Sequence, residues 1–173
     1  MKLREKHMKQ FSYVSTLAAA LVAAGLLAVP TAQAAGACVD SVTAGGWIEV
    51  GPDLFANFGL NAEQNLTTGE LTGELNYDDE NPQPECHVVS TDIVSYTILS
   101  DTCREIVYDV TVNGEPGFTA DVIVCDNGES VLDPADTFSI TVTNTEIVGN
   151  CTVAETPLAN GDVQVHPAHG NCL

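Results

Sequence analysis

The stretch from Cys103 to Val142 constrains the fold more than any other, because apolar and polar residues alternate along it. A period of two, with β-branched residues and threonine on the polar side, is typical of antiparallel strands with one solvated face. The apolar row that we expect in the core is Ile106, Tyr108, Val110, Val112, Phe118, Ala120, Val122, Val124, Phe138, Ile140 and Val142.

Asn113-Gly114 marks a hairpin between the first two of these strands. A two-residue turn would pair positions whose numbers sum to 227, which sets apolar residues opposite polar ones. A longer loop, with Gly114 or Gly117 in a left-handed conformation, gives a sum of 228 and keeps the faces matched. The second register places Cys103 opposite Cys125.

Further short strands are predicted over residues 47–50, 54–62, 71–77, 88–99, 147–153 and 162–166, the last two around a turn at 158–161. Phe58, Leu75 and Tyr96, together with Val94 and Ile98, are expected in the core. Helical periodicity is missing after Ala34. The sequence therefore predicts an all-β fold, an antiparallel meander of about eight strands, closed as a sandwich or as a barrel.

The first 34 residues have the pattern of a signal peptide. A basic start (Lys2, Arg4, Lys6, Lys9) precedes an apolar run that ends at Pro30, and small residues lead to Ala34. A membrane anchor is the alternative, but the run is short and rich in alanine. We expect cleavage after Ala34, a single extracellular domain over 35–173, and a secreted or periplasmic location.

Acidic residues dominate the charge. Four of the 5 basic residues and 1 of the 24 acidic residues lie in the leader, so Arg104 alone faces 23 carboxylates in the rest of the chain. Such a surface has nothing to neutralise phosphate, which argues against nucleic acid or an anionic membrane as a partner. A solvated acidic surface and cation binding both stay open as explanations.

All six cysteines lie beyond residue 34 and none forms a C-x-x-C motif, so three disulfides in an oxidising compartment are expected. The hairpin register favours Cys103–Cys125, because directly opposed Cβ atoms are within bridging reach. Cys38–Cys172 is a second expected pair, since chain ends often lie close together.

A series of short motifs, in order along nearly the whole of 35–173, resembles the post-COAP domain of secreted bacterial proteins. They are Gly45-Gly46-Trp47-Ile48, Asn57-Phe58-Gly59-Leu60-Asn61, Gly73-Glu74-Leu75-Asn76-Tyr77, Asn113-Gly114 with Gly117-Phe118-Thr119, Asp126-Asn127-Gly128-Glu129, Asp136-Thr137-Phe138 and Gly161 to His166. The resemblance implies a small β-rich extracellular domain and supplies no catalytic residues. The cysteines and the acidity of this chain depart from that pattern.

Patterns for catalysis are weak. The chain has no Gly-x-Ser-x-Gly motif, so a Ser-His-Asp site is not expected. Carboxylate pairs for glycoside hydrolysis stay open, although the aromatic residues, Trp47 among them, are interpreted as core. His166, His169 and Cys172 could share a metal, but Pro167 and Gly170 disfavour the helical turn that this needs.

The loop from Asp126 to Asp136 is the candidate metal site. It holds four carboxylates, and Gly128 permits a sharp turn, so Ca²⁺ binding by Asp126, Glu129, Asp133 and Asp136 is a hypothesis. An ordinary acidic surface turn is the alternative.

Three function classes follow from these patterns. The first is a secreted, non-catalytic domain that binds an extracellular ligand or surface component, with no cofactor except possible Ca²⁺. The second is a structural or self-assembling extracellular subunit, and the third is a hydrolase that uses surface carboxylates. We expect that the protein is not an enzyme and that, once the leader is removed, it has neither a nucleic-acid partner nor a membrane partner.

Overall fold

The protein is described here by a computed structural model covering residues 38–79, 85–128, 135–143, 151–169 and 172. Every strand of this part belongs to one compact unit, Gln33–Leu173. The predicted leader lies outside the described residues. The strands are β1 Val39–Gly51, β2 Leu54–Asn65, β3 Leu71–Asp79, β4 Cys86–Ile98, β5 Cys103–Val112, β6 Glu115–Cys125, β7 Thr137–Thr143 and β8 Thr152–His166.

The strands form an antiparallel meander in which each strand pairs with the next, and β8 returns to pair with β1. The fold class predicted from the sequence is therefore confirmed. The open choice between sandwich and barrel is decided for a closed barrel, which leaves no unpaired outermost strand. No helix in the described ranges is long and apolar enough to cross a lipid bilayer.

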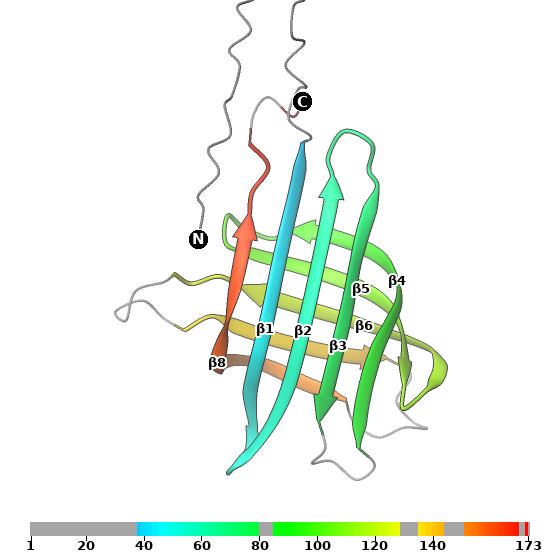
Figure 1. Cartoon of the computed structure of the whole chain (residues 1–173), viewed down its shortest axis with the longest axis vertical. Helices are drawn as coiled ribbons and strands as arrows, with labels where there is room; N and C mark the ends of the chain where they lie inside the picture. Colours follow the sequence, from blue (N-terminus) through cyan, green and yellow to red (C-terminus); the bar gives the residue numbers. More distant parts are fainter. Residues whose placement is uncertain (1–37, 80–84, 129–134, 144–150, 170–171, 173) are drawn as a thin grey trace, which may run out of the picture. The chain divides into compact units, whose positions relative to one another are not determined.

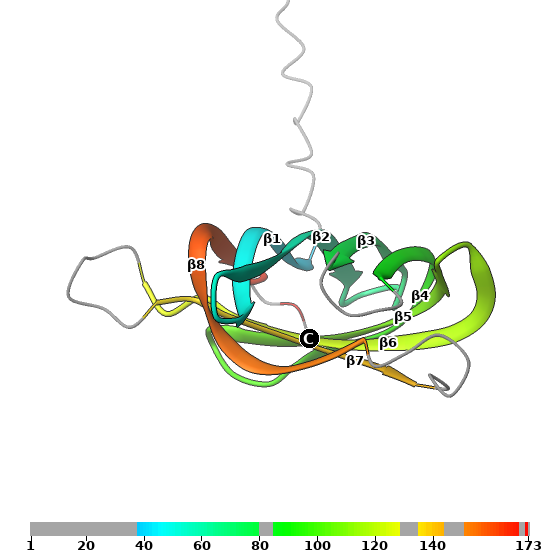
Figure 2. The same cartoon turned by 90° about the horizontal axis from the view of Figure 1, so that it is seen from below.

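The strands lie in two layers (Figures 1 and 2). β1, β2 and β3 form the front layer of Figure 1, and β5, β6 and β7 cross behind them at a steep angle. The two long strands β4 and β8 pass from one layer to the other. β4 carries register shifts at 90–92 and 93–95, and β8 carries them against both of its partners. Such bulges bend a strand, which is how a sheet turns a corner.

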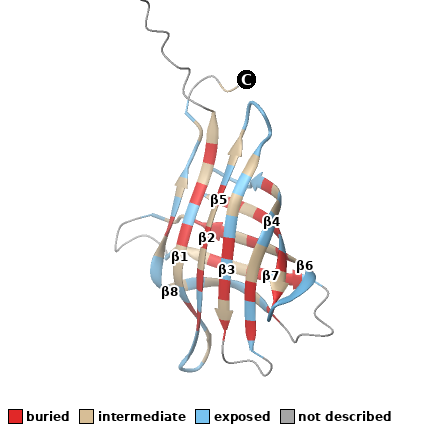
Figure 3. Ribbon diagram, turned by 45° about the vertical axis from the view of Figure 1, so that its right-hand side comes forward, coloured by how far each residue is buried: buried red, intermediate tan, exposed pale blue. Residues whose placement is uncertain are grey.

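The core lies between the two layers, and buried residues alternate with more exposed ones along β1, β2, β3, β5, β6 and β7 (Figure 3). Phe58 of β2 and Tyr77 of β3 stack on Phe138 of β7, with ring centroids 4.0 and 6.0 Å apart. The apolar row predicted between Cys103 and Val142 is buried, and so are Phe58, Leu75 and Tyr96.

Val94 and Ile98 were wrongly predicted in the core, since their side chains are 51% and 45% exposed. Val94 lies in the second bulge of β4, between Ile93 and Ser95, where the alternation of faces is broken. Ile98 is the last residue of β4 and lies beyond the packed interior.

The β5–β6 hairpin corrects part of the prediction: the expected longer loop is a tight two-residue turn, and the expected register begins only after a bulge. Asn113 and Gly114 have φ values of 53° and 84°, as a tight two-residue turn requires, and the pairs next to the turn sum to 227. A bulge at Gly117, with φ 97°, then shifts the sum to 228. From Phe118 onward the apolar faces match, and Cys103 lies opposite Cys125.

The C-terminal region differs from the prediction. Instead of two strands around a turn at 158–161, one strand runs from Thr152 to His166. Asn160 and Gly161 continue the ladder with Trp47 and Gly46 of β1. Gly161 has φ 119°, and a Cβ at either glycine would collide with the opposite backbone, so this close approach of β1 and β8 requires the glycine pair.

Candidate functional site

The outer face of the front layer carries a line of four residues that the strand register places side by side. Asp162 of β8 pairs with Gly45 of β1. Gly45 also pairs with Gly59 of β2, which in turn pairs with Asn76 of β3. Because neither glycine has a side chain, the sheet surface is lowered between the two polar ends of the line.

Two adjoining hollows, of 510 and 300 Å³, follow this line, and both contact Ala44 and Leu60. No residue of β5, β6 or β7 lines either hollow, so they open on the outside of the barrel and not into its core. We call the combined hollow the outer trough. Its lining is Thr43, Ala44, Gly45, Gly59, Leu60, Asn61, Glu74, Leu75, Asn76, Val89, Ser90, Asp162 and Gln164.

The wide end of the trough lies where β3 and β4 separate. Their ladder ends at the pair Asn76–Val89. One residue further, the Ser90 hydroxyl accepts a hydrogen bond from the Leu75 amide over 2.8 Å. A side chain thus replaces a backbone acceptor, which satisfies the Leu75 N–H while the two strands diverge.

Side chains that form hydrogen bonds line both halves of the trough. Asn61 Nδ2 donates to Glu74 Oε1 over 2.9 Å, and Gln164 Nε2 donates to Asp162 Oδ2 over 2.8 Å. Amides both donate and accept, whereas carboxylates accept. The trough therefore offers a mixed set of groups, rich in acceptors, to a ligand that carries hydroxyls.

Trp47 lies beside the trough, on the same outer face and two residues along β1 from Gly45. The expectation that Trp47 is core is wrong: its side chain is 43% exposed, as is that of Phe55. The two rings lie 5.7 Å apart between centroids, tilted by 44°. Val42, Ala44 and Ile48 occupy the inward positions of β1, so parity sends the intervening Trp47 outward.

A buried ion pair at one end of the barrel is a second cluster that the sequence analysis missed. Arg104 is 1% exposed, and its Nε and Nη2 donate to the Asp40 carboxylate over 2.6 and 2.9 Å. Tyr96 donates to the same carboxylate over 2.6 Å. Both charged residues have the inward parity of their strands, which is the signal that could have identified them.

This cluster joins β1, β4 and β5 and leaves few groups unsatisfied. Arg104 Nη1 donates to the carbonyls of Ser100 and Cys103, and the Ala168 amide donates to Asp40. Burial alone would raise the pKa of Asp40, but the hydrogen bonds from Arg104 and Tyr96 and the guanidinium charge hold it below its ordinary value. Burial and the neighbouring carboxylate raise the pKa of Tyr96, so its hydroxyl stays a donor. The geometry indicates a structural role.

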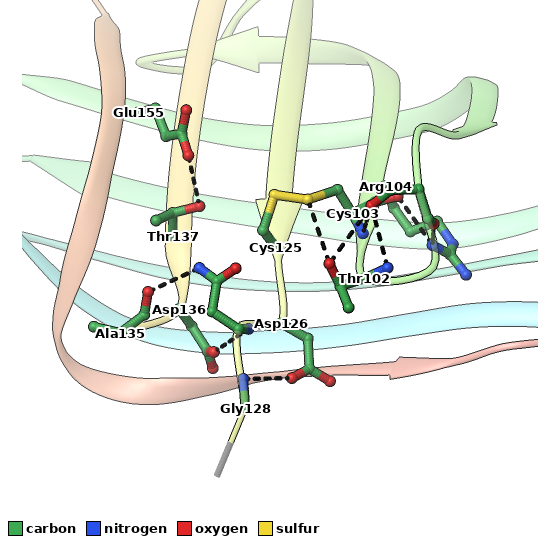
Figure 4. Close-up of a disulfide and its surroundings, with 12 residues drawn as sticks. Thr102, Cys103, Arg104, Cys125, Asp126, Gly128, Ala135, Asp136, Thr137 and Glu155 are labelled. Atoms are coloured by element: carbon green, nitrogen blue, oxygen red, sulfur yellow. Dashed lines mark hydrogen bonds between the residues drawn. A yellow bond between two sulfur atoms is a disulfide. The ribbon is translucent and has the colours of Figure 1, made fainter. Parts of the chain in front are cut away.

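The proposed calcium ligands are in part accounted for by backbone contacts (Figure 4). Asp136 accepts hydrogen bonds from the amides of Asn127 and Val163, each over 2.8 Å. Asp126 accepts from Gly128 and Val165 over 3.2 and 3.3 Å. The two carboxylates thus accept hydrogen bonds from β8 amides in the part of β8 that no longer pairs with β7.

The other two proposed ligands, Glu129 and Asp133, lie outside the described residues. Within the described ranges no three acidic, histidine or cysteine side chains come together as a metal site would require. Calcium binding by the loop stays a prediction. His166 and His169 are exposed, and Cys172 is bonded to Cys38.

Three disulfides cross-link the barrel: Cys38–Cys172, Cys86–Cys151 and Cys103–Cys125. The first and third are the pairs expected from the sequence. The third lies on the hairpin next to Asp126 and Arg104 (Figure 4). Together they define a disulfide-stabilised β domain, consistent with an oxidising compartment.

Asp121 lies on the outer face of β6, in surroundings that disfavour its charged form. Its Oδ1 is buried and has no hydrogen-bond partner in the described part of the chain. Burial, and then the charge of Glu105, raise the pKa of Asp121 above its ordinary value of 3.8. A raised carboxyl pKa destabilises the folded state as the pH rises above that ordinary value.

We therefore expect Asp121→Asn to raise the melting temperature at pH 7, and the gain to disappear as the pH falls toward 3.8. Asp109→Asn, which removes one charge from an exposed position on β5, is the matched control for net charge. Thermal unfolding followed by circular dichroism between pH 3 and pH 8 measures both. A gain that is equal in the two variants would assign the effect to net charge instead.

Comparisons with models of protein families, with curated proteins and with solved structures find no match for this chain. The resemblance to the post-COAP domain thus stays a prediction.

Proposed function

We propose that this protein is a secreted, non-catalytic β domain that binds uncharged glycans in the outer trough. The observation that carries the proposal is the glycine floor of Gly45 and Gly59 beside the exposed ring of Trp47. A hollow of this kind admits a flat ligand close to the sheet, while the indole offers an apolar platform with a polar edge. Pyranose rings fit both requirements, since they have an apolar face and a rim of hydroxyls.

The polar groups of the trough support the same ligand class. Sugar hydroxyls both donate and accept, which matches the amides of Asn61, Asn76 and Gln164 and the carboxylates of Glu74 and Asp162. Beyond the leader the chain has one basic residue against 23 acidic ones, and the basic residue, Arg104, is buried. Anionic glycans would therefore be repelled, which favours uncharged ones.

The test is binding of the purified, disulfide-intact protein to a panel of insoluble and soluble polysaccharides. The panel comprises cellulose, chitin, xylan, mannan and starch, with polygalacturonate as the anionic member. We expect at least one uncharged polysaccharide to bind, polygalacturonate not to bind, and Trp47→Ala to weaken the interaction by about tenfold or more. Ile98→Ala, which removes an exposed apolar side chain of β4, is the control.

A second variant fills the trough without removing a functional group. A Cβ at Gly59 would meet no atom within 4 Å, so Gly59→Val is compatible with the strand. We expect Gly59→Val to keep the melting temperature and to lose glycan binding. Thr72→Val, on the same sheet face but outside the trough, should change neither property. Full binding by Gly59→Val, or no binding to any member of the panel, would overturn the proposal.

A further inference from the structure

We infer that the outer trough takes a linear polysaccharide chain laid across the strands, with about one sugar residue over each strand. This inference rests on the proposed function and adds the shape and direction of the ligand. Its starting point is that the floor of the trough runs perpendicular to the strands. Asp162, Gly45, Gly59 and Asn76 contribute one residue each from β8, β1, β2 and β3.

The length of the trough follows from sheet geometry. Neighbouring strands are about 4.8 Å apart, so the line from β8 to β3 spans about 14 Å and its extension to Val89 on β4 about 19 Å. A pyranose unit of an extended chain advances by about one strand spacing. Three to four sugar residues therefore fill the trough, whereas a monosaccharide leaves most of its polar groups unused.

The outward-facing residues on the two sides of the floor repeat in step with it. On one side lie Gln164, Thr43, Asn61 and Glu74, each from a different strand and paired in register. On the other side, next to the line but outside the lining of the two hollows, the register aligns Asn160, Trp47, Asn57 and Asp78. Each strand thus supplies a group to both sides of the line, so successive sugars of a chain meet similar surroundings. Only a ligand that is itself repetitive and extended uses all of them.

The aromatic ring adds a polarity to the arrangement. Trp47 belongs to β1, so the sugar over β1 and β2 gains stacking, whereas the sugars toward Gln164 and toward Asn76 gain hydrogen bonds only. A short ligand should therefore occupy the position beside Trp47 first. Longer ligands should add contacts toward both ends of the trough.

The experiment is titration calorimetry of the whole protein with cello-, chito-, xylo-, manno- and malto-oligosaccharides of one to six sugars. The series matching the polysaccharide bound in the panel is the decisive one. We expect the affinity to rise by about tenfold or more between one and four sugars and to stay level beyond four. Asn76→Ala and Gln164→Ala remove side chains at opposite ends of the trough. Each should lower the affinity for the tetrasaccharide by several-fold, and at least one of the two should lower the affinity for the disaccharide by less.

The two proposals fail in different ways. Glycan binding that depends on Trp47 but is equally strong for one sugar and for four would overturn the chain-across-strands inference and leave the proposed function standing. An affinity that continues to rise up to six sugars would place the ligand on a longer surface and would likewise overturn it. If no glycan in the panel binds, the proposed function itself falls.

Discussion

Asp40→Ala is expected to lower the free energy of unfolding by about 3–5 kcal/mol, because it leaves a buried guanidinium without its carboxylate. Arg104 is 1% exposed and Asp40 2% exposed, and two hydrogen bonds of 2.6 and 2.9 Å join them. The same change removes the acceptor of the Tyr96 hydroxyl. Urea denaturation followed by tryptophan fluorescence measures the loss.

A double-mutant cycle separates the ion pair from the packing around it. We expect the double variant Asp40→Leu/Arg104→Met to be more stable than Asp40→Leu or Arg104→Met alone, because it leaves no unpaired charge in the interior. If the losses of the two single variants simply add, the pair is not coupled and the expectation is wrong.

The pH dependence of this pair has a defined sign. The pKa of Asp40 is lowered in the folded state, so its contribution to stability is present above the ordinary value of 3.8 and is lost as the pH falls through the folded value. The wild type should therefore lose stability steeply in acid below about pH 4. The double variant should show a shallower loss there.

Removal of the bridge between Cys38 and Cys172 is expected to have an effect of similar size. The two cysteines are separated by 134 residues, so the bridge constrains nearly the whole domain in the unfolded state. In the chain-entropy account such a loop contributes about 4–5 kcal/mol, against about 3 kcal/mol for the 22-residue separation of Cys103 and Cys125.

The comparison is made between two double variants, Cys38→Ser/Cys172→Ser and Cys103→Ser/Cys125→Ser. Each removes one bridge and leaves no unpaired thiol, so disulfide exchange does not confuse the result. Chemical denaturation should show the larger loss for the first variant. The opposite order would mean that folded-state contacts around the hairpin, and not loop closure, set the contribution of each bridge.

Much of the barrel is predictable because the local alternation of apolar and polar residues shows which side of a strand each residue faces. Ile106, Tyr108 and Val122 are inward for a reason that needs only the alternation of their own strands and a matched hairpin. The same parity fixed the facing of Cys103 and Cys125. It failed at Val94, because a bulge inserts one residue and exchanges the faces, and no pattern in the residues themselves announces it.

The candidate site depends on long-range alignment, which parity does not supply. Gly45 and Gly59 form one floor because β1 and β2 pair in one register. Asp162 joins that floor because the last strand closes onto the first. Arg104 and Asp40 likewise meet across 64 positions of sequence.

By itself, the sequence determined the fold class, the inward row of each regular strand and the hairpin, since each of these follows from neighbours within a few residues. Its composition determined the excess of negative charge. The tertiary structure alone decided the closed barrel, the exposed position of Trp47 beside the trough and the buried partner of Arg104, the one lysine or arginine beyond residue 34. The physical reason is that loop closure costs little more for distant segments than for near ones. Packing and hydrogen bonding between β1, β5 and β8 therefore choose the partners, and residues far apart in the chain become a single surface.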